Sequence, residues 1–472
     1  MRLTVVMRIL GFGLLLLPTA VAADPPDDLK EAVRRRKQAE QAWRKRTSIE
    51  AYEKVGRKNP KWDASAREAL TRALAVWNGD PAVTEEAVLE SARKAVAAGC
   101  DDPLILYVAA SMTARIRYGD PEELSKQYAN VVRDLGASAY HPLRKSAACL
   151  GALNFELALH PKPTPEQQTG MRVLFDSAAA LIPEFTRTDP PAPGDAAGYL
   201  ADLVKNGKFI AGDRKEVLDR VLEAAGKAWP NEPYISLVVK GATYIDYAWD
   251  ARGIGLANTV KDEGWKLMQE RLEVADDALE RAWAMDHAEP SAPTQMIGVE
   301  LGQGKGRDVM ERWWQRAMDA DPDNVQACRS KRYYLEPKWY GSPEEMLKFG
   351  RQCLAGGNWK AGIPFVLINA HDSLIHVTGH KPEVYLADPA VWKDIQTVFE
   401  TYLKKYPKAI LERTQYASWA CSAGRWDVAH SQFKILGDTP RLSVFRDQAT
   451  YDQYRKTAAE NVGKKPGAGK TK

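Results

Sequence analysis

The chain has few of the residues and runs that mark metal, redox or membrane proteins. Its 472 residues include only five cysteines, and none of these forms a Cys-x-x-Cys pair. Beyond the first residues, no stretch is apolar enough to cross a membrane. The formal net charge is only +4, which gives no global reason to expect nucleic acid as a partner. We therefore expect no cysteine-based zinc site, no nucleic-acid partner and no membrane span in the mature protein.

The cysteines lie far apart in the sequence, and most sit within apolar helical stretches. We expect them to be small buried core residues. The alternative is one disulfide, between Cys328 and Cys353 on adjacent helices. Because their number is odd, at least one thiol stays unpaired within the monomer. The five are Cys100, Cys149, Cys328, Cys353 and Cys421.

Motifs that mark common catalytic sites are also absent. There is no Gly-x-Ser-x-Gly elbow of a hydrolase. The turn Gly302-Gln303-Gly304-Lys305-Gly306 lacks the preceding strand and the Gly-Lys-Ser/Thr order of a phosphate loop. Glu90-Ser91 and Leu267-Met268-Gln269 lie too far apart for an enzyme that cleaves the cell wall. We expect no enzyme, and neither a catalytic residue nor a cofactor can be named.

The first residues have the pattern of a secretory signal peptide. Arg2 and Arg8 provide a basic start, and residues 9–17 form a short apolar core. Small residues at 20–23 offer a cleavage site before Asp24. We therefore predict a signal peptide over 1–23 and a periplasmic or secreted mature protein. A retained interfacial anchor is the alternative.

Nearly all of residues 65–440 has the 3.6-residue apolar periodicity of helices separated by turns. The run Phe365-Val366-Leu367-Ile368 lacks the alternation of a half-buried strand, and we predict a buried helix there. Three segments join a capping residue to proline and then to Glu or Gln, which is typical of a helix start. They are Asp120-Pro121-Glu122-Glu123, Thr164-Pro165-Glu166-Gln167 and Ser342-Pro343-Glu344-Glu345.

Residues 416–436 carry the spacing of a helical hairpin. Small Ala417 is followed by Gly424 and then by Trp426, after which Ala429 and Phe433 continue the pattern. Small residues let two helices pack closely, and the glycine permits a tight turn between them. This spacing resembles that of the tetratricopeptide repeat (TPR) superfamily.

A second unit, 294–322, has Gly298 at the small position and Gly306 near the turn, and Gly241 is the small residue of the preceding unit. The TPR resemblance implies an all-α, right-handed α-solenoid of degenerate TPR-like hairpins over 65–440. Several strings are also similar to an uncharacterised family of exported bacterial TPR-like proteins, which implies fold and export but no chemistry. These strings include Tyr247-Ala248-Trp249-Asp250-Ala251-Arg252-Gly253 and Tyr334-Leu335-Glu336-Pro337-Lys338-Trp339-Tyr340-Gly341-Ser342.

Two basic segments flank the predicted solenoid. In residues 24–64, basic side chains crowd around Arg34-Arg35-Arg36-Lys37 and Arg44-Lys45-Arg46. We predict a partly helical, solvated or loosely docked arm there, with weak contact to an anionic partner as the alternative. Residues 441–472 are predicted to hold the end of a helix and a disordered basic tail.

The TPR resemblance also predicts where a partner binds, because the first helix of each repeat lines the concave surface. We expect an exported, non-enzymatic scaffold that binds a protein or peptide there. Neighbouring aromatics such as Trp313-Trp314 pack in the core or form part of an exposed platform. The register places six residues in the groove: Gln295, Val299, Gln326, Arg329, Tyr333 and Glu336.

The alternative function is an enzyme, or a protein that binds a small ligand or a metal. One candidate site is the loop from Asp250 to Gly255, where glycines would let a ligand approach the backbone. The other is the cluster of His371, His376 and His380, whose spacing could hold zinc. Ordinary ion pairs and helix-end polar contacts explain the same residues without a ligand, so no metal is assigned.

Overall fold

A computed structural model describes residues 25–116, 120–210, 213–379 and 381–464, so the predicted signal peptide lies outside the described residues. Within these ranges the chain is all-α, and no β-strand is present. The helices are α1 (Asp27–Arg46), α2 (Ile49–Val55), α3 (Asp63–Trp77), α4 (Glu85–Ala97), α5 (Pro103–Ile116), α6 (Pro121–Gly136), α7 (Pro142–Leu159), α8 (Pro165–Ala180), α9 (Pro193–Gly207), α10 (Arg214–Ala228) and α11 (Pro233–Arg252). They continue as α12 (Asp262–Met285), α13 (Ser291–Gln303), α14 (Arg307–Ala320), α15 (Val325–Tyr334), α16 (Pro343–Gly356), α17 (Phe365–Thr378), α18 (Pro382–Tyr385), α19 (Pro389–Lys405), α20 (Ile410–Ser422), α21 (Trp426–Leu436) and α22 (Gln448–Glu460). Short 3-10 helices are η1 (Ile182–Glu184), η2 (Ala257–Thr259) and η3 (Leu442–Val444).

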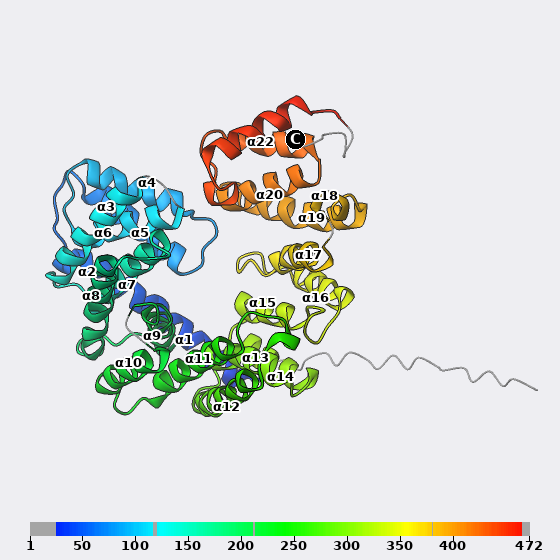
Figure 1. Ribbon diagram of the computed structural model, residues 1–472. Helices are drawn as coiled ribbons and strands as arrows, with labels where there is room; N and C mark the ends of the chain where they lie inside the picture. Colours follow the sequence, from blue (N-terminus) through cyan, green and yellow to red (C-terminus); the bar gives the residue numbers. More distant parts are fainter. Residues whose placement is uncertain (1–24, 117–119, 211–212, 380, 465–472) are drawn as a thin grey trace, which may run out of the picture.

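The helices follow one another around a strongly curved path, and most pack against their neighbours in sequence (Figure 1). Helices α3 to α10 form one side, α11 to α14 the base, and α15 to α22 the other side. This successive packing is that of a helical-repeat protein, in which each hairpin buries its apolar face on the next. The arrangement is compatible with a TPR-like fold.

Local sequence signals set the helix starts as predicted. The Asp120 carboxylate accepts hydrogen bonds from the backbone N–H groups of Glu122 and Glu123 at the start of α6. Thr164 and Gln167 form a reciprocal capping box at the start of α8. These side chains replace hydrogen-bond partners that the first turn of a helix lacks. The three proline-containing starts are therefore confirmed, including the one capped by Ser342.

The hairpin predicted from residues 416–436 is formed by α20 and α21. Ala417, Ala429 and Phe433 are almost fully buried between the two helices. Gly424 has a φ of 63°, the left-handed conformation that allows the tight turn. The apolar run that begins at Phe365 is also helical and opens α17.

Another small-residue contact joins the two longest adjacent helices, α11 and α12. A Cβ atom at Gly241 would collide with the side chain of Leu279, which is fully buried. We expect Gly241→Val to lower the free energy of unfolding by about 3 kcal/mol because the larger side chain overpacks this contact. Denaturant unfolding measures the change. Gly226→Ala is the control, since a Cβ there meets nothing within 4 Å and alanine should raise stability by about 1 kcal/mol; equal stabilities of the two variants would contradict the packing argument.

Helix α1 is firmly packed and is not a loosely docked arm, although Arg34 and Arg35 lie on a solvated face. Trp43 of α1 is only 3% exposed, and its indole N–H donates to the backbone carbonyl of Asp189 at 2.9 Å. Several basic side chains of α1 are paired within the chain: Arg36 with Glu40, Lys37 with Asp321 and Asp323, Arg44 with Asp195, and Arg46 with Asp189. Helix α1 therefore connects the start of α9 to the end of α14 as a brace, and the contact of this segment with an external anion stays a prediction.

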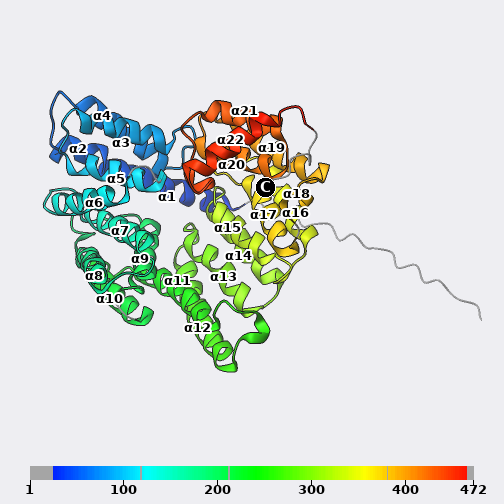
Figure 2. The same ribbon diagram turned by 45° about the horizontal axis from the view of Figure 1, so that its top comes forward.

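The two ends of the array meet. The Arg441 guanidinium, which is 7% exposed, binds the carboxylates of Glu85 and Glu86 at the start of α4. Figure 2 shows α3 and α4 on one side of this junction and α20 to α22 on the other. A hollow of about 600 Å³ also lies there, lined from α4 by Leu89 and from the far end by Leu442. We call this junction the seam.

The helical packing extends past both predicted ends of the 65–440 segment. Beyond residue 440, α22 packs on α21, and Tyr451 is fully buried against Phe433 and Phe445. This part of the predicted C-terminal segment is thus a packed helix because its aromatic residues complete the last core cluster. The final residues, 465–472, lie outside the described residues.

Candidate functional site

The structure separates the six residues predicted to line one groove. Gln295, Gln326 and Arg329 are exposed, and Tyr333 is half-buried. Val299 is fully buried in the core, and Glu336 is 3% exposed, so the expectation that these two line an open surface is wrong. Glu336 follows the end of α15 and pairs with Arg332 and Lys338. The template register fails there because α15 is too short to carry its last groove position.

The remaining predicted residues do not share one hollow. Gln295 lines a shallow hollow of about 260 Å³ next to α9 and α11. Arg329 lines a different one, of about 480 Å³. Tyr333 packs against Trp339 and beneath the Lys338 ammonium, 4.7 Å from its ring centre. Whether these residues contact a partner stays a prediction, but only Arg329 belongs to a sizeable groove.

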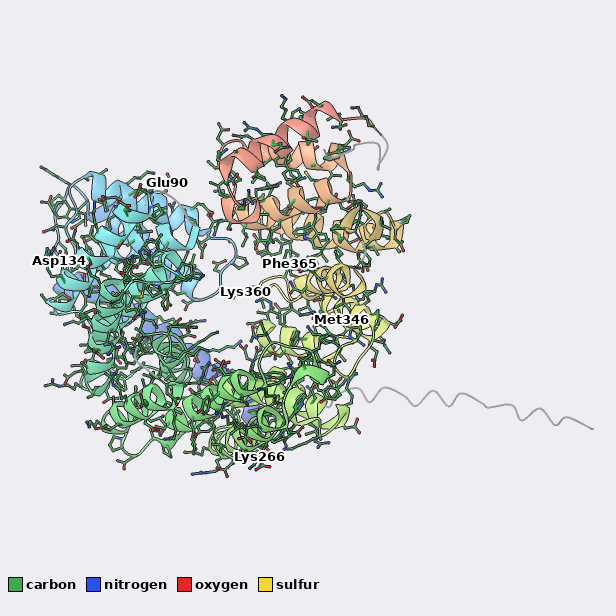
Figure 3. The ribbon with its side chains drawn as sticks, viewed as in Figure 1. Glu90, Asp134, Lys266, Met346, Lys360 and Phe365 are labelled. Atoms are coloured by element: carbon green, nitrogen blue, oxygen red, sulfur yellow. The ribbon has the colours of Figure 1, made fainter. Side chains whose placement is uncertain are left out.

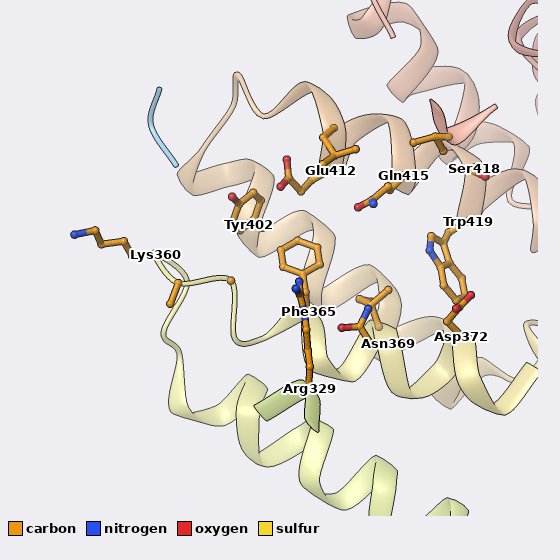
Figure 4. Close-up of a pocket in the computed structure, with 15 residues that line it drawn as sticks. Arg329, Lys360, Phe365, Asn369, Asp372, Tyr402, Glu412, Gln415, Ser418 and Trp419 are labelled. Atoms are coloured by element: carbon orange, nitrogen blue, oxygen red, sulfur yellow. The ribbon is translucent and has the colours of Figure 1, made fainter. Parts of the chain in front are cut away.

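The groove that contains Arg329 is built from both sides of the α17 to α20 packing. Helix α17 contributes Phe365, Asn369 and Asp372, and the facing wall comes from α19 and α20 (Figure 4). Figure 3 shows Lys360 and Phe365 at the inner side of the curved array. We call this the α17–α20 groove; its other main lining residues are Tyr402, Glu412, Gln415, Ser418 and Trp419.

The groove combines aromatic walls with charges of both signs. Phe365 meets Tyr402 edge to face, with ring centres 4.9 Å apart. Burial, together with nearby Glu85 and Glu86, raises the pKa of Glu412 even though the Arg441 charge acts to lower it. Arg329 is exposed and forms no ion pair with any described residue. It is therefore free to bind an acidic group in the groove.

One buried polar atom in the groove lacks a hydrogen-bond partner. The Oδ1 atom of Asn369 is inaccessible to solvent and accepts no hydrogen bond from the described residues. A buried acceptor left unpaired costs about 1–3 kcal/mol, so a hydrogen-bond donor from a ligand would be favourable here. A side-chain amide can accept from and donate to a peptide backbone, as an extended ligand requires. The sequence alone did not indicate Asn369, because the start of α17 is apparent there only as an apolar run.

The loop from Asp250 to Gly255 has ordinary contacts within the fold. The Asp250 carboxylate binds the Arg214 guanidinium at 2.8 Å and the Lys208 ammonium at 3.2 Å. Arg252 lies among the rings of three tryptophans, Trp249, Trp265 and Trp339, and donates to the carbonyls of Gly253 and Gly255. Both candidate side chains, Asp250 and Arg252, are thus engaged by other groups of the fold.

The histidine cluster does not converge in the described part of the chain. His371 is fully buried and hydrogen-bonds the Tyr385 hydroxyl at 2.8 Å and the Asp394 carboxylate at 3.3 Å. His376 is exposed and contacts the carbonyl of Asp372, while His380 lies outside the described residues. Among the described residues, no three His, Cys, Asp or Glu side chains are grouped so that they could hold a metal ion.

The adjacent aromatics serve mainly as core. Trp313 is 4% exposed and packs edge to face on Trp283, and the guanidinium of Arg316 stacks on both rings. Trp314 projects toward a separate cavity beside α16. The tryptophans therefore do not form one exposed platform.

Comparisons with known proteins give no family for this chain. No model of a known protein family matches it, and no curated protein matches it. None of the described helices has the length and apolar character needed to cross a membrane. The groove itself therefore provides the evidence for a function.

Proposed function

We propose that this protein is an exported, non-enzymatic, TPR-like scaffold that binds an extended peptide segment of a partner protein on its inner surface. The α17–α20 groove is the proposed site. Among the described residues, Arg329 has no ion pair and the Asn369 Oδ1 atom has no hydrogen-bond partner, and these two groups carry the proposal. The hairpin spacing and the successive helix packing support the TPR-like class. The basic start and small residues at 20–23 support export.

The chemistry of the groove favours a peptide over an apolar helix. An amphipathic helix needs a continuous apolar trough, whereas this groove alternates aromatic side chains with charged and amide groups. The Arg329 guanidinium suits a carboxylate, either an acidic side chain or a chain end. Asn369 would bind the peptide backbone, and Phe365 and Trp419 would cover apolar side chains.

The surroundings of the titratable side chains also favour a binding role over an enzymatic one. Catalysis needs such groups to converge on one reacting atom. Asp250 and His371, which belong to the two alternative sites, are each engaged by neighbours in the fold. No observation favours the alternative function over the scaffold.

We expect Arg329→Ala to weaken peptide binding by about 1–2 kcal/mol, typical of a moderate hot spot. An array of fluorescein-labelled synthetic peptides, acidic and neutral, would first identify ligands, and fluorescence anisotropy would then measure their affinities. Gln326→Ala is the matched control, because Gln326 is exposed on the same helix but does not line the groove. Equal affinities of the two variants, or no ligand in the array, would refute the site.

The export part of the proposal has its own test. We expect mature protein recovered outside the cytoplasm to begin at Ala23 or Asp24, since the small residues at 20–23 precede this point. N-terminal sequencing checks this directly. Exported protein that retains Met1 would contradict signal cleavage.

A further inference from the structure

The two most exposed large apolar side chains of the described residues lie together in the connection between α11 and α12. Ile254 has a relative exposure of 108% and Leu256 of 75%. Neither belongs to a hydrophobic cluster of the fold. Single exposed apolar residues are common on protein surfaces, but this pair protrudes from one short loop. We call residues 253–256 the α11–α12 tip.

A third exposed apolar side chain, Phe209, lies near the α11–α12 tip. Phe209 is 60% exposed and follows Lys208, directly after the end of α9. The Lys208 ammonium is 5.0 Å from the centre of the Phe209 ring and 3.2 Å from the Asp250 carboxylate. Asp250 lies in the last turn of α11. These contacts place Phe209 close to the end of α11 that carries the tip.

The backbone of the tip is hydrogen-bonded within the chain, although its apolar side chains face solvent. The Arg252 guanidinium donates to the carbonyls of Gly253 and Gly255 at 3.0 and 2.9 Å. The Leu256 carbonyl accepts from the backbone N–H and the hydroxyl of Thr259 at 2.8 and 2.7 Å. A backbone polar group that enters an apolar phase without a partner carries a large free-energy cost. These three carbonyls can therefore leave water and stay hydrogen-bonded.

The surroundings of the tip favour a lipid surface over a partner protein. Protein partners commonly form hydrogen bonds across an interface, whereas the interior of a bilayer offers no donor to a loop carbonyl. The charges behind the tip are of both signs, because Lys261, Asp262 and Glu263 are exposed and form no ion pair with any described residue. Zwitterionic headgroups carry both signs, whereas attraction to anionic lipid needs clustered Lys or Arg.

We propose that the α11–α12 tip is a membrane anchor that inserts Ile254, Leu256 and Phe209 into the surface of a zwitterionic phospholipid bilayer. Insertion removes these apolar side chains from water, and the internally bonded carbonyls enter the bilayer without losing a partner. The tip belongs to the base of the array, whereas the α17–α20 groove lies on one side (Figure 1). The anchor is therefore independent of peptide binding at that groove.

The test uses the chain from Asp24, because the apolar residues 9–17 could themselves bind lipid and this start removes no described residue. Phosphatidylcholine vesicles should sediment the unaltered protein at both low and high salt, since insertion and not charge drives the binding. Ile254→Asp should weaken partitioning by about tenfold or more, because a carboxylate replaces an inserted apolar side chain. Ile435→Asp is the matched control, since Ile435 is 62% exposed but lies on α21.

A fluorescent label reports insertion directly. All five cysteines are buried and none is in a disulfide, so a thiol-reactive nitrobenzoxadiazole label attaches selectively to the Ile254→Cys variant. Its emission should shift to the blue with vesicles and be quenched by nitroxide lipids, whereas the same label on Ile435→Cys should not respond. Circular dichroism confirms that each variant is folded.

Three results would overturn the proposal. They are an absence of vesicle binding, equal partitioning of Ile254→Asp and Ile435→Asp, and a label at position 254 that does not respond to lipid. Self-association that Ile254→Asp abolishes, without vesicle binding, would identify a second copy of the chain as the occupant and would equally overturn it.

Discussion

Arg441→Ala should open the seam between the two ends of the helical array. Arg441 is buried, and its removal leaves Glu85 and Glu86 side by side without the cation that they share. Breaking a buried ion pair by removing one partner costs about 3 kcal/mol or more. We expect a larger radius of gyration by small-angle X-ray scattering and a loss of about 3 kcal/mol in the free energy of unfolding.

Arg446→Ala is the matched control for the seam. Arg446 lies in the same connection, but its side chain is 88% exposed, and Asp447 is its one ion-pair partner among the described residues. Surface ion pairs of this kind contribute little to stability. An Arg441→Ala protein with the scattering profile and stability of Arg446→Ala would show that the seam does not hold the ends together.

The same seam should respond to acid. Burial alone would raise the pKa of Glu85, but the charges and hydrogen bonds of Arg115 and Arg441 hold it below its usual range. A carboxylate with a lowered folded pKa stabilises the protein above its unfolded pKa of about 4.3, and this contribution disappears as the pH falls through the folded value. The seam should therefore weaken below about pH 4. Glu85→Gln should remove this part of the acid response in unfolding curves.

Trp43→Ala is expected to cause the largest loss of stability, about 3–5 kcal/mol. The indole is buried, packs edge to face on His141 at 5.5 Å, and lies 5.2 Å from the Arg144 guanidinium. Its N–H also binds the Asp189 carbonyl. Truncation to alanine leaves a cavity under α1 and removes this hydrogen bond. Denaturant unfolding measures the loss.

Arg35→Ala provides the comparison on the same helix. The Arg35 side chain is 69% exposed, and its contact with Glu31 is long, at 3.8 Å. We expect its stability to stay within about 0.5 kcal/mol of the unaltered protein. If Trp43→Ala were equally mild, α1 would be a loosely attached arm and not a brace.

Hairpin and cap signals made the fold predictable because they act over a few residues. The proline-containing starts at Asp120, Thr164 and Ser342 each satisfy backbone groups in their own first turn. The small residues around Ala417 and Ala429 determine how closely adjacent helices approach. These signals depend on residues within one hairpin, so they can be recognised even where the repeats differ in sequence.

The candidate site was predictable only in part. Arg329 was predicted from the repeat register and lies at the α17–α20 groove, but its role in binding stays a prediction. Val299 and Glu336 were misplaced because a template assumes equal helix lengths and equal packing. Asn369 and Trp419 were missed, since the groove combines them from separate hairpins.

By itself, the sequence determined that this protein is an array of helical hairpins, through local periodicity, capping and small-residue contacts. Only the tertiary structure decided that α1 braces the array and that Arg441 reaches Glu85 across the seam. These contacts depend on the position and rotation of each helix relative to elements outside its own hairpin. Small differences in the position and rotation of each helix accumulate over many stacked hairpins. No local sequence pattern determines the overall geometry that results.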